Sequence, residues 1–308
     1  MKAKAWLNAV RLRTLPLSVS GILIGSGLAG MYGYKDWPIF ILALLSTLGL
    51  QIISNLANDY GDGIKGTDNE ERIGPKRAYQ TGALSRKELK TGILVAVMIT
   101  LSFIGVLLYR AFDGLPEYFL LFTLLGVLAV WAAIRYTVGD SAYGYKGLGD
   151  IFVFSFFGLL SVLGSMFLFT KFLTLISVLP AISIGLLSTA VLNLNNLRDH
   201  NSDVRAGKNT LVVKLGIPRA KQYHYLLLIG SFLCITLFLF LSATYWFQTI
   251  CLVVFFPLGM HLFKVNRVKE PQAFDPELKK VALSTFFMAL LPHPFWNKPS
   301  KFLLLKTT

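Results

Sequence analysis

Long apolar segments alternate with short polar segments along most of the 308-residue chain. An α-helix needs about 20 mostly apolar residues to cross the hydrocarbon core of a bilayer. Nine segments approach this length and composition, and we expect a transmembrane helix in each, at residues 16–32, 38–57, 92–109, 118–134, 150–169, 172–192, 225–243, 246–264 and 281–295. The pattern predicts an all-α integral membrane protein with about nine transmembrane helices in a single domain, residues 1–308. Only the tail, about residues 292–308, is atypical, because prolines interrupt the last helix.

Composition agrees with a bilayer as the solvent of this chain. Hydrophobic residues make up 54% of the sequence and charged residues 15%, and the mean hydropathy is +0.60. Soluble domains carry roughly 25% charged residues. This composition excludes the ordinary soluble and disordered classes. The two cysteines, Cys234 and Cys251, both lie in apolar segments, so the sequence contains neither a disulfide framework nor a CxxC motif.

The distribution of basic residues predicts the orientation in the membrane. The formal net charge is +14, which by itself would also suit a nucleic-acid-binding protein. If the amino terminus is cytoplasmic, 24 of the 30 lysines and arginines lie on the cytoplasmic side of the nine spans. Such an excess is the usual determinant of topology. We therefore expect a multi-pass protein of the cell inner (plasma) membrane with a cytoplasmic amino terminus, and no nucleic-acid partner.

Two longer polar segments, residues 58–91 and 193–224, interrupt the alternation. Each follows an even-numbered span and falls on the predicted cytoplasmic side. Each opens with asparagines and aspartates, which indicates a weak internal repeat of two spans and a polar loop. In the first segment, a helix that continues beyond the second span places Asn55, Asp59 and Asp62 on one face, at positions i, i+4 and i+7.

The second polar segment repeats this chemistry. Asn195, Asp199 and Asp203 are spaced by four residues, so they also share a helix face. An aspartate within a membrane helix costs roughly 2.5–3.5 kcal/mol on insertion scales, which favours a compensating ligand. Carboxylate and amide oxygens suit Mg²⁺, with Mn²⁺ as a possible substitute. We expect the metal ligands to be Asp59, Asp62, Asp199 and Asp203.

Basic residues accompany both acidic clusters. Two facing metal sites would hold a diphosphate between them, and nearby cations would complete its neutralisation. The candidate cations are Lys65, Arg72, Lys76, Arg77, Arg198, Arg205 and Lys208. Near the first span, Arg13 is a candidate for binding an acceptor carboxylate, although it also fits the distribution of topological charges.

At these residues the sequence resembles the UbiA superfamily of intramembrane aromatic prenyltransferases. Asn58-Asp59-Tyr60-Gly61-Asp62, followed by Asp68 after a longer gap than usual, resembles the first family motif. Asp199-His200-Asn201-Ser202-Asp203 resembles the second. The likeness covers about residues 5–290 and is greatest to the members that prenylate 1,4-dihydroxy-2-naphthoate.

The resemblance implies a UbiA-type bundle with a cytoplasmic-side cavity. It implies Mg-dependent transfer of a polyprenyl group from polyprenyl diphosphate to 1,4-dihydroxy-2-naphthoate, with loss of CO2 and diphosphate. The product would be demethylmenaquinol, an intermediate of menaquinone biosynthesis. Catalysis would involve the four metal-binding aspartates and Lys146, which precedes the fifth span. The expected substrate-binding residues are Arg13, Asn55, Asn58, Asp68, Arg72, Lys76, Arg77, Tyr143, Asn195, Arg198 and Lys208.

Two alternative functions remain open at this point. A related enzyme would share the metal site but prenylate 4-hydroxybenzoate or another aromatic acceptor. A cation-coupled transporter would use intramembrane acids for the coupling ion and basic residues for an anionic solute. Discontinuous helices in mid-membrane would favour the transporter, whereas the acids here cluster at the cytoplasmic ends of spans.

Overall fold

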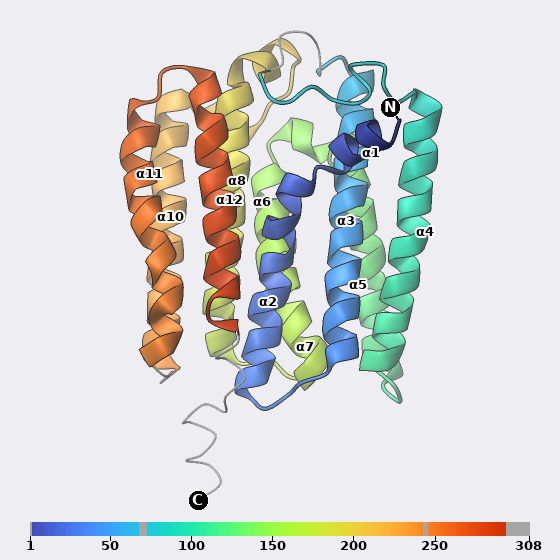
Figure 1. Ribbon diagram of the computed structural model, residues 1–308, viewed down its shortest axis with the longest axis vertical. Coiled ribbons are helices and arrows are strands. Elements are labelled where there is room, and N and C mark those ends of the chain that lie inside the picture. Colours follow the sequence, from blue (N-terminus) through green and yellow to red (C-terminus); the bar gives the residue numbers. More distant parts are fainter. Residues whose placement is uncertain (1, 68–72, 243–245, 294–308) are drawn as a thin grey trace, which may run out of the picture.

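The computed structural model describes residues 2–67, 73–242 and 246–293. Within these residues every regular element is helical, and successive long helices run in opposite directions (Figure 1). The α-helices are α1 (Lys2–Val10), α2 (Leu15–Met31), α3 (Trp37–Ile64), α4 (Arg86–Ala111), α5 (Pro116–Arg135), α6 (Gly149–Val153), α7 (Ser165–Thr170), α8 (Val178–Arg205), α9 (Leu211–Leu215), α10 (Ile217–Leu241), α11 (Phe255–Arg267) and α12 (Phe274–Leu290).

Eight helical runs in the described part of the chain are long and apolar enough to cross a membrane. They coincide with the first eight predicted spans. Helices α3 and α8 continue without a break well beyond the predicted apolar segments, to Ile64 and Arg205. Asp59 and Asp62 therefore lie on α3, and Asp199 and Asp203 on α8, as the spacing predicts.

The ninth predicted span, residues 281–295, corresponds to helix α12. This helix has 17 residues and begins at Phe274, earlier than the hydropathy suggests. Its first turn carries Asp275 and Glu277, and these charges conceal its start from a reading of apolar residues. It packs against α2 and α8, so the last helix lies beside the first long one. Residues 294 and 295 lie outside the described residues.

Local signals in the sequence start two of the long helices. Asp36 caps α3 by accepting a hydrogen bond from the backbone N–H of Ile39 (3.0 Å). Ser85 and Glu88 form a reciprocal capping box at the start of α4. These caps end the polar loops sharply and let the apolar residues begin within the first turns.

The fifth span is irregular. Its middle, Phe154–Gly164, forms a π-helix between α6 and α7. π-Helical segments are rare and occur frequently at functional sites. This segment packs closely on α8, because a Cβ placed on Gly158 would lie 2.5 Å from the Cα of Gly185. Glycine is required at Gly158 for this close approach.

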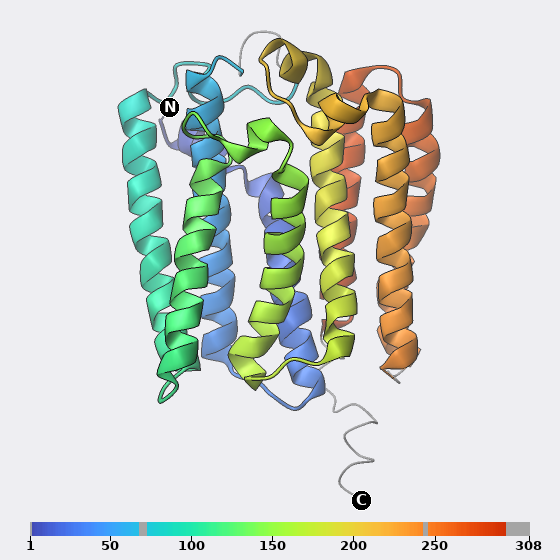
Figure 2. The same ribbon diagram turned by 180° about the vertical axis from the view of Figure 1, so that it is seen from behind.

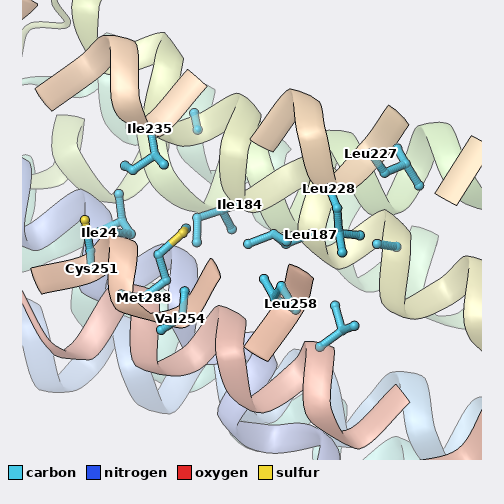
Figure 3. Close-up of a cluster of buried hydrophobic side chains, with 14 of the residues drawn as sticks. Ile24, Ile184, Leu187, Leu227, Leu228, Ile235, Cys251, Val254, Leu258 and Met288 are labelled. Atoms are coloured by element: carbon cyan, nitrogen blue, oxygen red, sulfur yellow. The ribbon is translucent and has the colours of Figure 1, made fainter. Parts of the chain in front are cut away.

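A buried apolar cluster joins the carboxyl-terminal helices to the rest of the bundle. Figure 3 shows Ile24 of α2 close to Ile184 of α8, Ile235 of α10 and Met288 of α12. Leu258 of α11 extends the same cluster. Beside this cluster, His224 of α10, His261 of α11 and Glu277 of α12 form a buried polar chain, with contacts of 2.8 and 2.6 Å between successive side chains.

The two polar loops lie at the same end of the molecule. The loop after α3 and the loop between α8 and α10 both cover the end at which α1 lies (Figures 1 and 2). The carboxyl-terminal ends of α3 and α8 meet these loops there. The fold thus brings the two acidic clusters, which lie about 140 positions apart in the sequence, to one end of the bundle.

Candidate active site

A cavity of about 690 Å³ lies inside the bundle. Polar side chains line the end near the two loops, and apolar residues such as Ile22, Leu108 and Leu168 line the deeper part. A concave site with a mostly apolar wall and a few convergent polar groups is typical of small-molecule binding. The predicted site residues that line it are Arg13, Asn55, Asn58, Asp62, Arg77, Tyr143, Asn195, Arg198 and Lys208.

Asp62 and Asp203, the last aspartates of the two helical clusters, meet at Lys208. The Lys208 Nζ lies 3.9 Å from Asp62 Oδ2 and 3.9 Å from Asp203 Oδ1. Lys208 is only 8% exposed. Burial alone would lower the pKa of this lysine, but the two carboxylates outweigh burial and raise its pKa. Lys208 therefore remains a cation between two anions.

Tyr145 completes this group, which we call the Lys208 subsite (Asp62, Tyr145, Asp203 and Lys208). Its hydroxyl donates to Asp62 Oδ1 (2.7 Å) and lies 2.6 Å from Thr67 Oγ1. Burial, and then the charge of Asp62, raise the pKa of Tyr145, so its hydroxyl stays protonated. Tyr145 directly precedes the predicted Lys146 but escaped the sequence analysis as a site residue.

Two backbone hydrogen bonds position the Lys208 subsite. The N–H of Lys208 donates to the Asp203 carbonyl (2.8 Å), after a turn in which Gly207 has a φ of 67°. The N–H of Asn209 donates to the Tyr145 carbonyl (3.1 Å). The loop after α8 is thereby joined both to its own helix and to the loop before α6.

The other two predicted metal ligands have different partners. Asp59 is 1% exposed and accepts hydrogen bonds from the backbone N–H groups of Ala78 (3.1 Å) and Tyr79 (3.3 Å). Asp199 accepts two bonds from the guanidinium of Arg198, at 2.9 and 2.8 Å. Of the four predicted metal ligands, only Asp62 is among the residues that line the cavity, and Asp203 approaches it through Lys208. The helical spacing is as predicted, but the four aspartates do not converge on one point.

Arg198 is the centre of a second polar group, the Arg198 subsite (Arg13, Asn195, Arg198, Asp199 and Asp275). Its side chain is 2% exposed. Besides its two bonds to Asp199, it donates to Asn195 Oδ1 (2.8 Å) and to Asp275 Oδ1 (2.6 Å). Arg13 Nη1 lies 3.9 Å from the other oxygen of Asp275.

Asp275 was not among the predicted site residues. The sequence places it in a polar stretch between the eighth and ninth spans, where it reads as part of a loop. The early start of α12 turns this stretch into a wall of the cavity, which Pro276 and Leu278 also line. A helix start could have been suspected from Asp275 and Glu277 around Pro276, because acidic residues and proline favour first turns.

Three further predicted residues are held by neighbours at the cavity wall. Asn55 donates to the Val10 carbonyl (2.8 Å), which holds the junction of α1 and α2 against α3. Asn58 Oδ1 accepts a bond from Thr137 Oγ1 (3.1 Å). Tyr143 stacks on the Phe152 ring at a centroid distance of 3.9 Å, and burial raises the pKa of its hydroxyl.

The remaining predicted residues lie away from the cavity or outside the described part of the chain. Lys76 and Lys146 are exposed and do not line the cavity. The backbone carbonyl of Lys146 accepts a hydrogen bond from Lys214 Nζ (2.7 Å). Asp68 and Arg72 lie outside the described residues, so the structure does not place them.

The donor chemistry of the Lys208 subsite suits a hard cation. Its candidate ligands are the carboxylates Asp62 and Asp203, with no sulfur or imidazole beside them in the contacts described above. Within the described residues there is no group of three or more His, Cys, Asp or Glu side chains able to hold a metal on its own. Mg²⁺ commonly takes one or two carboxylates and completes its shell with water and substrate phosphates. The residues therefore fit a metal that arrives with a phosphorylated substrate.

Comparison with known proteins places the chain in a family. Residues 18–291 match the UbiA prenyltransferase family. The chain is 43% identical to the 1,4-dihydroxy-2-naphthoate octaprenyltransferases of Escherichia coli (strain K12) and Haemophilus influenzae, over 94% of each chain. It shares its fold with a UbiA homolog from Archaeoglobus fulgidus bound to DMAPP and Mg²⁺, at a TM-score of 0.66 and 14% identity, over 93% of this chain and 99% of that one. The chain is thus a multi-pass membrane protein that belongs to the UbiA prenyltransferase family.

Proposed function

We propose that this protein transfers a polyprenyl group from polyprenyl diphosphate to 1,4-dihydroxy-2-naphthoate, releasing CO2 and diphosphate and forming demethylmenaquinol. The observation that carries the proposal is the cavity, which has two polar subsites at one end and an apolar interior. Full-length similarity to 1,4-dihydroxy-2-naphthoate octaprenyltransferases supports this choice of acceptor. The uninterrupted α3 and α8 favour an enzyme over a transporter, whose ion sites usually lie at broken helices.

The cavity suits the two unlike parts of a polyprenyl diphosphate. The diphosphate binds at the Lys208 subsite, where Lys208 supplies a permanent positive charge. Arg77 also lines this polar end and adds a second cation. The isoprenoid tail extends into the apolar interior, past residues such as Leu108 and Leu168. Burial of the tail contributes binding energy along its length.

Mg²⁺ would be held by Asp62 and Asp203 together with the diphosphate, and Mn²⁺ would serve in its place. When bound, the ion stabilises the negative charge that develops on the leaving diphosphate. Asp59 and Asp199 support these ligands indirectly. Asp59 holds the loop around Ala78, and Asp199 holds the Arg198 side chain. Tyr145 orients the Asp62 carboxylate by donating a hydrogen bond to it.

The reaction breaks the bond between the first prenyl carbon and its diphosphate oxygen, and the electron pair leaves with the diphosphate. The positive charge that develops on the allylic carbon must be kept from water. Apolar residues and the Tyr143 ring, which is fixed by stacking on Phe152, line the space where it forms. The Tyr143 hydroxyl donates to the Ala132 carbonyl (2.8 Å) and stays protonated because burial raises its pKa, so the ring beside the cation is neutral and aromatic.

The acceptor ring attacks through the carbon that bears its carboxylate. A carbon–carbon bond forms there, and the bond to the carboxylate then breaks, returning its electron pair to the ring and releasing CO2. The hydroxyl protons lost and regained during these steps cancel, so the ring ends as a prenylated hydroquinone.

An acceptor panel tests the proposal. Membranes containing the protein are incubated with a labelled polyprenyl diphosphate, Mg²⁺ and either 1,4-dihydroxy-2-naphthoate or 4-hydroxybenzoate. We expect labelled product and CO2 only with the naphthoate. EDTA should stop the reaction and added Mg²⁺ should restore it. Transfer to 4-hydroxybenzoate but not to the naphthoate would contradict the assigned acceptor.

We further propose that the polar end of the bundle faces the cytoplasm and that the protein lies in the inner (plasma) membrane. The excess of lysine and arginine at this end supports the orientation. A cysteine introduced at exposed Lys76 should react with a membrane-impermeant maleimide only in inside-out vesicles. A cysteine introduced at exposed Asp113, near the opposite end, is the matched control and should react only in right-side-out vesicles.

A further inference from the structure

We propose that Asp275 occupies the place of the acceptor carboxylate at Arg198 and Arg13 when no acceptor is bound, and that the acceptor enters by displacing it. This inference rests on the proposed function and deepens it. It makes Asp275 a residue that determines acceptor specificity, through exchange of one carboxylate for another.

The contacts of Arg198 divide into permanent and exchangeable ones. Asp199 and Asn195 belong to the same helix as Arg198, and Asp199 is itself buried. Asp275 comes from a different helix, and its side chain is 42% exposed. Among the hydrogen bonds of Arg198 described above, only the bond to Asp275 (2.6 Å, from Nη1) can therefore be replaced without moving α8.

The two subsites suit different anions. The Lys208 subsite presents two carboxylates with one lysine, which would repel a bare carboxylate and accept a diphosphate only with a metal. The Arg198 subsite presents two arginines, whose planar forks match a carboxylate. Asn195, Asp199 and Asp203 follow one another along α8 at roughly 6 Å per four residues. The Arg198 subsite thus lies about one turn deeper than the Lys208 subsite, beside the apolar interior where the prenyl chain lies.

When Asp275 leaves, Arg198 keeps its bonds to Asp199 and Asn195, but its buried Nη1 loses the acceptor described above and favours a replacement. The carboxylate of the acceptor provides one, whereas an acceptor without a carboxylate does not. Asp275 can leave because its side chain already reaches solvent at the start of α12. The exchange therefore admits carboxylated acceptors and opposes neutral ones.

Binding measurements with two ligands test the exchange. The probes are 1-hydroxy-2-naphthoate, which carries the carboxylate but lacks the second hydroxyl, and 1-naphthol, which lacks the carboxylate. Both are titrated into purified protein in lipid nanodiscs and followed by calorimetry. Asp275→Asn keeps an oxygen for Arg198 but removes the competing charge. We expect it to tighten hydroxynaphthoate binding about fivefold, comparable to a partly exposed ion pair, and to leave naphthol binding unchanged.

Two variants serve as controls. Asp36→Asn changes an aspartate that pairs with Arg110 at 3.0 Å and caps the start of α3, at the end of this helix opposite Asp62, and it should change neither affinity. Asp275→Glu keeps the charge and should behave more like the wild type than Asp275→Asn does. Thermal unfolding of each variant establishes that it is folded. If Asp275→Asn does not fold, Asp275→Ser provides the same test.

Steady-state kinetics give a second measurement. In a folded Asp275→Asn variant, the KM for 1,4-dihydroxy-2-naphthoate should fall while the KM for the prenyl diphosphate stays constant. Unchanged or weaker binding of hydroxynaphthoate by the folded variant would overturn the exchange. If the wild type transfers no prenyl group to 1,4-dihydroxy-2-naphthoate at all, the proposed function fails instead, so the two failures are distinguishable.

Discussion

The outer and inner aspartates of the two acidic clusters have the same chemistry and different surroundings. The outer pair, Asp62 and Asp203, flanks Lys208 at 3.9 Å. The inner pair is committed to structural partners: Asp59 accepts bonds from two backbone N–H groups, and Asp199 accepts two bonds from Arg198. We infer different roles for the two pairs, because both oxygens of Asp59 and of Asp199 accept hydrogen bonds from protein groups, whereas Asp62 and Asp203 share one lysine.

This contrast also separates stability from chemistry. Two carboxylates around one lysine leave an excess of negative charge, which the proposed Mg²⁺ would neutralise. The inner pair carries no such excess, since Asp199 is matched by Arg198 and Asp59 by oriented backbone dipoles. We therefore expect substitutions of the outer pair to affect turnover and those of the inner pair to affect folding first.

The largest effect is expected at the outer pair. Asp62→Asn or Asp203→Asn should lower prenyl transfer by about a hundredfold or more, because metal and leaving-group stabilisation are lost. The unfolding temperature should change little, because each substitution removes one of two neighbouring negative charges and so relieves repulsion between them. Turnover in nanodiscs and thermal unfolding measure the two quantities. Near-normal turnover in either variant would remove the outer pair from the site.

At the inner pair, Asp199→Ala should lower the free energy of unfolding by about 3–5 kcal/mol, because it removes the buried carboxylate that accepts two hydrogen bonds from the buried Arg198. Denaturant unfolding in a fixed detergent measures this loss. Asp203→Ala on the same helix is the matched control and should cost less. A loss of turnover with unchanged stability would instead mean that Asp199 binds the metal directly.

A smaller effect is expected at Asp59. Asp59→Ala removes the acceptor of two backbone hydrogen bonds and should cost about 1–3 kcal/mol of stability. The loss should be local, because both donors, Ala78 and Tyr79, belong to the loop after α3. Amide hydrogen exchange over residues 73–85 should therefore accelerate. Protection that stays at the wild-type level would contradict an anchoring role.

The smallest effect is expected at Tyr145, whose hydroxyl donates to Asp62 (2.7 Å). Tyr145→Phe should lower turnover only several-fold, the equivalent of about 1 kcal/mol for one hydrogen bond. Because the pKa of Tyr145 is raised, its hydroxyl stays protonated in alkaline solution. The ratio of wild-type to variant turnover should therefore be the same at about pH 7 and about pH 9. A ratio that falls towards pH 9 would show that the hydroxyl ionises.

Much of the fold followed from the chain alone. Hydropathy located the apolar segments, because a membrane helix must satisfy its own backbone and face lipid along its length. The four-residue spacing correctly placed the aspartates on α3 and α8. The start of α12 was missed because Asp275 and Glu277 lie in its first turn. Negative charge stabilises the start of a helix, but a hydropathy pattern assigns charged residues to a loop.

The sequence by itself determined the number and order of the apolar helices, the shared end of the two acidic loops and the kinds of side chain available there. Only the tertiary structure decided which aspartates face the cavity, that Tyr145 and Lys208 join Asp62, and that Asp275 meets Arg198. The physical reason is the distance along the chain over which each interaction acts. Helix periodicity and hydropathy act between neighbours in the chain, whereas these contacts join residues 77 to 146 positions apart, whose pairing depends on how whole helices pack.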